Sequence, residues 1–333
     1  MAQAAGSPTK GDIDILRFLS AVEQIESDLW LQYNELGGIQ DSEVPGGSGS
    51  VAYTNALKKL DEDMDQYIHD NTEDEFSHHA FLNAFLEFLG APAVDLTPFR
   101  TLKGSQATGA NKSALRLTNL MGLSVDTSWL TRYRSRANNP DLDPTFVFPQ
   151  AVPTLNSGHH TAIPRTDADL TPLNHIQAIA NTAAFHFASI EQGGTSLYPT
   201  LALKVTNPVI LRILLSIGPT ETMHFQTWQD KAGNAIKPDL APLTDGSLTF
   251  PDLSSAGEDF QPNLIMPEPC PFLDRKFPVC SIIRPVSTDP STFGAVAAIK
   301  GLAASGLFIG QPNAFFSAAI ALAQAADAAT RQC

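Results

Sequence analysis

Apolar residues recur at intervals of three and four along four long stretches of the chain, which is the spacing of one face of a helix. The stretches run from Ile13 to about Leu36, from Val51 through Leu89, from Pro172 to about Val205, and from Pro208 to about Ala232. Pro219 falls inside the fourth stretch, where proline is expected to kink or restart a helix. The pattern predicts an all-α protein built on four long helices.

The connections between these helices differ in length. Residues 92–171 are rich in Pro, Thr, Asn and Ser, with apolar helical pieces at Ser113 to Leu123 and around Trp129, whereas the other two connections are short. The order short, long, short is the connectivity of ferritin-like four-helix bundles. We therefore expect a ferritin-like bundle over residues 12–235, with 92–171 as a long insertion in the crossover between its second and third helices.

The remaining residues, 236–333, have a different composition. The part from Gly233 to Ser291 is Pro-rich and is expected to be irregular, whereas residues 292–329 are Ala-rich and predict two small-residue helices packed on the bundle. The most apolar tract, Phe293 to Gly310, contains Lys300 and falls short of the roughly 20 apolar residues that a membrane span needs. We expect one main domain with an appended C-terminal region and no membrane span.

Two short motifs of the same spelling lie far apart in the chain. Glu75-Phe-Ser-His78 and Glu221-Thr-Met-His224 are both Glu-x-x-His, which places a carboxylate and an imidazole on one face of a helix. A lone glutamate precedes each motif in an apolar pattern, namely Glu23 and Glu191. Two such motifs with one glutamate from each of two other helices form the ligand set of a carboxylate-bridged metal pair.

The repeat extends to aromatic residues. Trp30 follows Glu23 by seven residues and Tyr198 follows Glu191 by seven, which is about 10 Å along a helix axis, so each ring lies nearly on the face of its carboxylate. Glu26 competes with Glu23 for one ligand position. Because the seven-residue offset favours Glu23, Glu26 is expected beside the site or lining a pocket. Trp30, Tyr198 and His186 are further candidates for residues around the ligands, although packing in the core is an alternative for all three.

Oxygen- and nitrogen-rich ligands with bridging carboxylates suit iron or manganese, whereas structural zinc takes tetrahedral thiolate or imidazole ligands. The expected cofactor is thus two metal ions, iron or manganese, with two glutamates each bridging both ions. Such a pair exchanges two electrons, so the expected small-molecule partner is O2 or H2O2.

Charge and cysteines limit the remaining possibilities. The net charge is −14, which argues against nucleic acid as the main partner. Cys270 and Cys280 flank a Pro-rich loop, where either a disulfide or two free thiols would fit, and Cys333 could replace either partner. The first residues do not form a signal peptide, and they would also suit the start of a mature secreted chain.

At these residues the chain resembles the ferritin-like superfamily, and more narrowly the family of plant desiccation-related proteins and fungal stress-associated relatives. The similar segments are Leu16 to Trp30, Glu73 to Phe81, Leu115 to Ser135 and Glu221 to Ala235. The resemblance implies Glu23, Glu75, His78, Glu191, Glu221 and His224 as metal ligands, and secreted or periplasmic rather than cytoplasmic placement.

Three functions are compatible with these observations. The first is a di-iron or di-manganese oxidoreductase that acts on dioxygen or peroxide in a stress-related role. The second is iron sequestration through ferroxidase chemistry, and the third is a non-catalytic stress or surface scaffold. The sequence assigns no catalytic residue beyond the ligands, and it leaves a homo-oligomer open. We expect the first function, because the ligand set is complete and repeated in two halves.

Overall fold

The computed structural model describes residues 6–132, 147–257, 260, 276 and 294–332, and within these it is predominantly helical, which confirms the predicted all-α class. The long helices are α1 (Lys10–Gly37), α3 (Met64–Phe88), α6 (Leu173–Ala202) and α7 (Pro208–Gly233). The shorter ones are α2 (Val51–Leu57), α4 (Trp129–Arg132), α5 (Pro153–Ser157), α8 (Ala295–Ala304) and α9 (Asn313–Asp327). Short 3₁₀ turns are η1 (Thr97–Phe99), η2 (Asp167–Leu170) and η3 (Asn234–Ile236). Strand β1 (Leu102–Lys103) pairs antiparallel with β2 (Leu115–Arg116), and β3 (Leu243–Asp245) with β4 (Leu248–Phe250).

Local side-chain hydrogen bonds fix where two of the long helices begin. At the start of α1, the Thr9 hydroxyl accepts from the Asp12 amide while the Asp12 carboxylate accepts from the Thr9 amide, which is a capping box. Before α7, the Asn207 side chain accepts from two backbone amides, and Pro208 occupies the first position, where no amide donor is needed.

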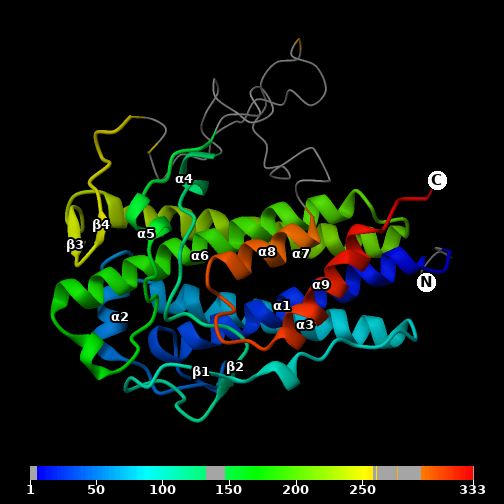
Figure 1. Ribbon diagram of the computed structural model, residues 1–333, viewed down its shortest axis with the longest axis horizontal. Coiled ribbons are helices and arrows are strands. Elements are labelled where there is room, and N and C mark those ends of the chain that lie inside the picture. Colours follow the sequence, from blue (N-terminus) through cyan, green and yellow to red (C-terminus); the bar gives the residue numbers. More distant parts are fainter. Residues whose placement is uncertain (1–5, 133–146, 258–259, 261–275, 277–293, 333) are drawn as a thin grey trace.

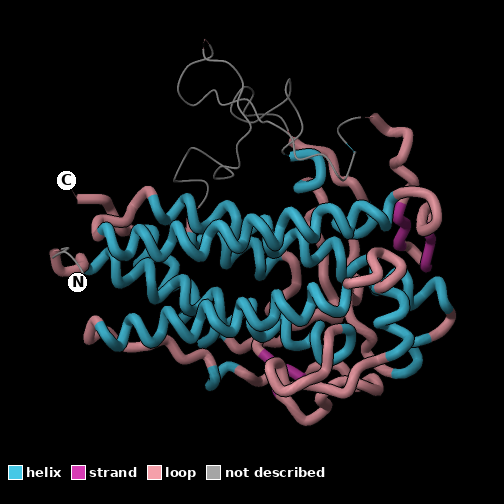
Figure 2. Tube along the Cα trace, turned by 180° about the vertical axis from the view of Figure 1, so that it is seen from behind, coloured by secondary structure: helices cyan, strands magenta, loops and turns pink. Residues whose placement is uncertain are grey.

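The four long helices run side by side as two packed pairs (Figure 2). Helix α1 packs along α3, and α6 packs along α7. Their buried apolar residues form two separate clusters, one around Trp30, Phe187 and Trp228 and the other around Leu16, Leu201 and Leu214. All four long helices contribute to both clusters, so each helix passes from one apolar cluster to the other along its length.

The C-terminal helices α8 and α9 lie against the long helices, as the Ala-rich composition predicts (Figure 1). They pack on each other, and α9 also contacts α1 while α8 contacts α6. The Asp327 carboxylate, at the end of α9, accepts hydrogen bonds from the Ala295 and Val296 amides at the start of α8. The last helix therefore caps the one before it.

Two predicted elements are wrong in detail. The stretch 51–89 is not one helix but two, α2 and α3, because its acidic middle forms turns in which the Asp61 carboxylate accepts from the Asp63 amide and pairs with Lys231. Residues 113–123 are not helical. There the chain is held in extended and irregular form because the buried Asp28 carboxylate accepts from the Leu117 and Thr118 amides.

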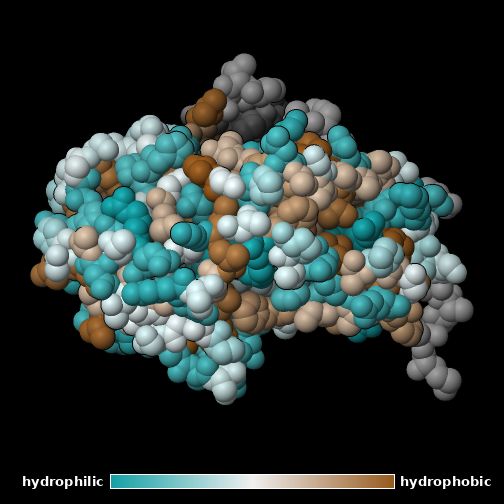
Figure 3. All heavy atoms as spheres, turned by 60° about the horizontal axis from the view of Figure 1, so that its bottom comes forward, coloured by the Kyte–Doolittle hydropathy of each residue, from teal (hydrophilic) through white to brown (hydrophobic). Residues whose placement is uncertain are grey.

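Helix α7 continues through Pro219 as one element. Within the described ranges, none of the helices has both the length and the apolar character needed to cross a membrane. The face drawn in Figure 3 mixes hydrophilic and neutral residues with separate apolar patches.

Candidate metal centre

The four long helices bring the six predicted ligand residues to one place. On each helix these residues lie between the part that belongs to one apolar cluster and the part that belongs to the other. Together they form a polar layer between the two clusters. We use "polar layer" for these six side chains: Glu23 of α1, Glu75 and His78 of α3, Glu191 of α6, and Glu221 and His224 of α7. Five of them are buried and His224 is partly buried.

The polar layer consists of two overlapping groups of possible ligands. One contains Glu23 and His78, the other contains Glu191 and His224, and both include Glu75 and Glu221. Within each group, one ligand atom from every residue lies within 4.8 Å of the others. Either group could hold a metal ion, and the two shared carboxylates reach both positions.

The two imidazoles face these carboxylates through the same ring atom. Nδ1 of His78 lies 3.3 Å from Oε2 of Glu23 and 3.2 Å from Oε2 of Glu75. Nδ1 of His224 lies 3.2 Å from Oε2 of Glu191 and 3.4 Å from Oε1 of Glu75. Each histidine therefore joins the lone glutamate of the neighbouring helix to a shared carboxylate.

The outer ring atoms of the histidines are held by residues that sequence reasoning missed. Nε2 of His78 lies 3.3 Å from the Thr220 hydroxyl, and Nε2 of His224 lies 2.9 Å from the Asp74 carboxylate. Thr220 and Asp74 each directly precede the glutamate of the opposite Glu-x-x-His motif. Such outer contacts fix the ring orientation of a ligating histidine.

Trp30 and Tyr198 each donate a hydrogen bond to the lone glutamate of the other helix, and not to the glutamate on their own helix. The Trp30 indole Nε1 donates to Oε1 of Glu191 over 3.0 Å, and the Tyr198 hydroxyl donates to Oε1 of Glu23. Trp30 also stacks on Trp228, with ring centroids 5.3 Å apart. Trp30 and Tyr198 therefore lie near the polar layer, as predicted, but each contacts the carboxylate of the other glutamate–aromatic pair.

Asn71 is a further residue that the sequence analysis did not single out. Its amide Nδ2 donates to Oε1 of Glu75 over 3.0 Å and to Oε1 of Glu191 over 3.2 Å, while its carbonyl accepts from the Trp228 indole. It lies one helical turn before Glu75 on α3. That spacing alone is too common in helices to have identified it.

Burial and mutual repulsion dominate the electrostatics of the layer. Burial, opposed by hydrogen bonds to His224 and His78, raises the pKa of Glu75 to about 7, and burial with the neighbouring carboxylates raises the pKa of Glu221 well above its usual value. Burial tends to lower the pKa of His78, but its contacts with Glu23 and Glu75 outweigh this and raise it to about 10. This concentration of carboxylates would be stabilised by a cation.

Glu221 provides the most direct test of whether a cation fits. Both of its carboxylate oxygens are buried without a hydrogen-bond partner among the described residues, although buried polar atoms are normally paired. A Cβ added at Gly194 would lie 2.2 Å from Oε2 of Glu221, so the glycine leaves room for this carboxylate. A carboxylate that accepts no hydrogen bond and is shared by two ligand groups fits a position between two cations.

The remaining candidates lie outside the six-residue layer. Glu26 is buried but belongs to neither ligand group, and it lines a neighbouring cavity, which is one of the two placements expected for it. His186 is buried away from the carboxylates, with Nδ1 2.7 Å from the Tyr33 hydroxyl, and it lines the same cavity.

A third group with ligand character lies elsewhere in the described chain. Asp41, Glu43 and the buried His69 come within the same distance of one another, with His69 Nε2 3.6 Å from each carboxylate. Both acids are exposed, and the sequence analysis did not select these residues because they have no regular spacing.

Comparisons with protein-family models, with curated proteins and with solved structures found no significant match. The resemblance to the ferritin-like superfamily therefore stays a prediction from the sequence. The alternatives for Cys270, Cys280 and Cys333 concern residues outside those that the structure describes.

Proposed function

We propose that the polar layer holds two metal ions, iron or manganese, and that the protein is an oxidoreductase acting on dioxygen or hydrogen peroxide. The observation that carries this proposal is the sharing of Glu75 and Glu221 by both ligand groups, with neither carboxylate oxygen of Glu221 hydrogen-bonded to a described residue. The order of the ligand-bearing helices, with a long crossover between α3 and α6, supports a ferritin-like bundle as the scaffold.

The residues of the polar layer and its neighbours would have different roles in metal binding. Glu75 and Glu221 would bridge the two positions, while Glu23 with His78 and Glu191 with His224 would complete one position each. When bound, a pair of iron or manganese ions would exchange two electrons with dioxygen or peroxide. Trp30 and Tyr198 orient the lone glutamates, and Asp74 and Thr220 orient the imidazoles.

The position of the layer also suits redox chemistry. An apolar cluster lies on each side of it along the helices, and every glutamate in it is buried. Charged groups interact more strongly in such surroundings than in water. Reactive oxygen species would thus meet the metals in a site that restricts side reactions.

Elemental analysis of protein purified from its native host, followed by measurement of peroxide consumption and oxygen uptake, tests the proposal. The expected result is about two iron or manganese ions per chain with turnover that a Glu75→Ala, His78→Ala double variant abolishes. Protein that binds neither metal, even after reconstitution, would overturn it. Bound metal without any redox turnover would instead favour a scaffold role.

A further inference from the structure

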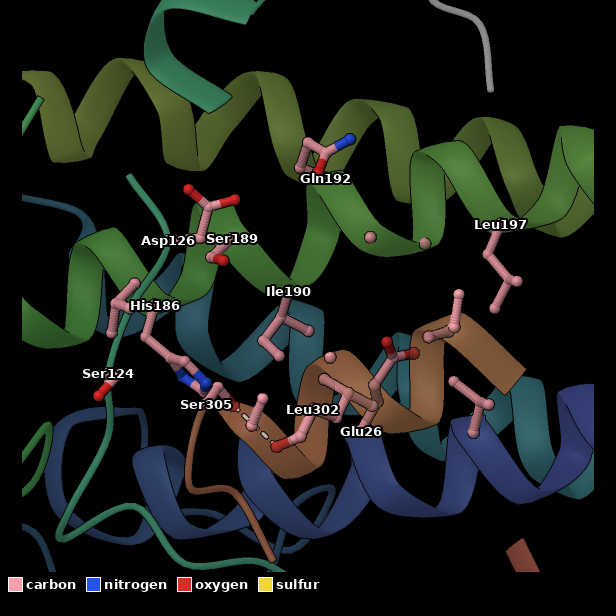
Figure 4. A pocket seen from close by; sticks show the side chains of 18 of the residues that line it. Glu26, Ser124, Asp126, His186, Ser189, Ile190, Gln192, Leu197, Leu302 and Ser305 are labelled. Atoms are coloured by element: carbon pink, nitrogen blue, oxygen red, sulfur yellow. Dashed lines mark hydrogen bonds between the residues drawn. The ribbon is translucent and has the colours of Figure 1, made fainter. Parts of the chain in front are cut away.

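A cavity of about 540 Å³ lies next to the polar layer, between α1, α6, α8 and the crossover segment (Figure 4). This volume is within the range of small-molecule binding sites, which is roughly 300–1,000 Å³. The proposed metal ligands do not line it, so none of the six residues is needed to form it. The cavity is therefore a feature of the fold that the metal proposal leaves unexplained.

Two residues connect the cavity with the polar layer. Gly194 lines the cavity and also contacts Glu221 on its other side, where an added Cβ would overlap the carboxylate. Glu26 is 8% exposed, lines the cavity from α1, and has no hydrogen-bond or ion-pair partner among the described residues. Figure 4 shows its carboxyl group directed from α1 toward the side of α6 that carries Ile190.

The middle of the cavity is apolar and is kept open by small residues. Ile190 and Leu197 of α6 face Ala298, Gly301 and Leu302 of α8 across it. A Cβ added at Gly301, or at Gly193 on α6, would meet nothing within 4 Å. Because α8 lines this space mostly with alanine and glycine, and Leu302 is its one large side chain in the lining, the space between α8 and α6 is not filled by the protein itself.

Polar residues line the end of the cavity that the crossover segment forms. Ser124 and Asp126 from this segment and Ser189 from α6 lie there, as Figure 4 shows. The cavity thus combines an apolar middle with one polar end and a single carboxyl group beside the metal layer. A molecule that matched this distribution would be mostly apolar, with a polar group able to donate a hydrogen bond to Glu26.

From this arrangement we infer that the cavity binds a medium-sized apolar molecule with a terminal hydroxyl or amine, whose polar end lies at Glu26. An oxygen of the Glu26 carboxyl accepts a hydrogen bond in either protonation state. A carboxylate ligand is disfavoured because it would bring another negative charge into a cavity whose Gly194 wall contacts the buried carboxylate of Glu221.

The role of this ligand as a substrate rests on the proposed function, whereas its binding does not. Oxidation of a primary alcohol to an aldehyde releases two electrons and two protons. One hydrogen peroxide takes up both and becomes two water molecules. Under the proposed function the ligand would be the two-electron reductant and hydrogen peroxide the oxidant.

Calorimetric titration with 1-decanol, decylamine and decanoate tests the inference. At about 30 Å³ for each non-hydrogen atom, the volume of one liquid water molecule, these probes occupy roughly 330–360 Å³ and fit the cavity. We expect decanol and decylamine to bind at least tenfold more tightly than decanoate. Equal binding of all three, preference for decanoate, or no binding would overturn the inference.

Cavity-filling variants locate the binding. Gly301 of α8 and Gly193 of α6 line the cavity and have room for a larger side chain, so Gly301→Leu and Gly193→Leu are each expected to weaken decanol binding at least tenfold. Ala321→Leu on the exposed face of α9 creates the same side chain elsewhere and should change nothing. Undiminished binding to both glycine variants would contradict the assignment.

Metal content, measured on the same samples, separates this inference from the proposed function. Protein that binds decanol but takes up neither iron nor manganese, even after reconstitution, would uphold the cavity and reject the metal centre. Metal-loaded protein that binds none of the probes would support the metal centre and reject the cavity as a binding site.

Discussion

The Tyr198 hydroxyl donates a hydrogen bond to the Glu23 carboxylate, although Tyr198 belongs to α6 and Glu23 to α1. The reciprocal bond runs from Trp30 of α1 to Glu191 of α6. Each helix therefore supplies one lone glutamate and the aromatic donor that holds the glutamate of the other helix. The two bonds tie the two helix pairs together at the level of the polar layer.

Replacing Tyr198 with phenylalanine is expected to destabilise the protein by about 1.5–3 kcal/mol, because a hydrogen bond to a charged group is lost and the carboxylate stays buried. Urea unfolding measures the change. Tyr53→Phe is a suitable control, since the Tyr53 hydroxyl donates to the neutral carbonyl of Ala162 and should cost only about 0.5–1.5 kcal/mol. A smaller loss for Tyr198→Phe than for the control would show that Glu23 does not depend on this donor.

The shared carboxylates predict a difference in metal stoichiometry between single variants. Glu221→Ala removes a side chain common to both ligand groups, so bound metal should fall toward none. Glu23→Ala and Glu191→Ala each remove a residue of one group only, so about half of the metal should remain. Elemental analysis after gel filtration distinguishes the two outcomes. Identical losses in all three variants would argue against separate terminal ligands.

Two adjacent glycines of α6 allow a closely matched comparison. Gly194→Ala places a Cβ 2.2 Å from Oε2 of Glu221, which must move, whereas a Cβ at Gly193 meets nothing within 4 Å. We expect Gly194→Ala to weaken metal binding at least tenfold and Gly193→Ala to leave it unchanged. Competition with a chromogenic chelator measures the affinity. Equal affinities would mean that the position of Glu221 is not critical.

The pKa values of the layer predict a pH dependence for the metal-free protein. The pKa of Glu75 is raised from 4.5 to about 7 and that of His78 from 6.5 to about 10, so the folded protein holds more protons than the unfolded chain. Their stabilising effect is complete below the unfolded pKa values and is lost as the pH rises through the folded ones. The melting temperature should therefore fall between about pH 5 and pH 9.

Metal binding should show the opposite trend, because ligands must release their protons before they coordinate. Affinity is expected to rise with pH over the range in which Glu75 and His78 hold protons in the metal-free protein. Calorimetry in buffers of different ionisation enthalpy would detect the released protons. Affinity that stays constant from pH 6 to pH 8 would contradict a site built on these two residues.

The polar layer could be predicted from the sequence because its paired residues lie close together in the chain. Glu75 with His78, and Glu221 with His224, lie three residues apart on one helix, so helical geometry alone aims each pair at one point. The boundaries of α1, α6 and α7 followed from apolar periodicity in the same way. Periodicity records which face of a helix is buried, and all three helices have buried residues from the first turn to the last.

What the sequence did not reveal depends on contacts between distant segments. Residues 113–123 carry a helical apolar pattern, yet Arg116 pairs with the buried Glu35 and the following amides bind Asp28, and these contacts override local propensity. Likewise, Asp74 and Thr220 became relevant only when the opposite motif was in place. A spacing rule applies within one helix and gives no information on partners from another.

The capping of α8 by Asp327 has a consequence for how the protein is made. All six side chains of the polar layer precede residue 225, whereas the cavity wall is α8, residues 295–304, and its cap comes later still. During synthesis the side chains of the polar layer emerge from the ribosome about 70 residues ahead of this wall, which corresponds to several seconds at usual elongation rates. If the polar layer binds metal as proposed, the nascent chain has an interval in which ions would reach it before the wall is in place.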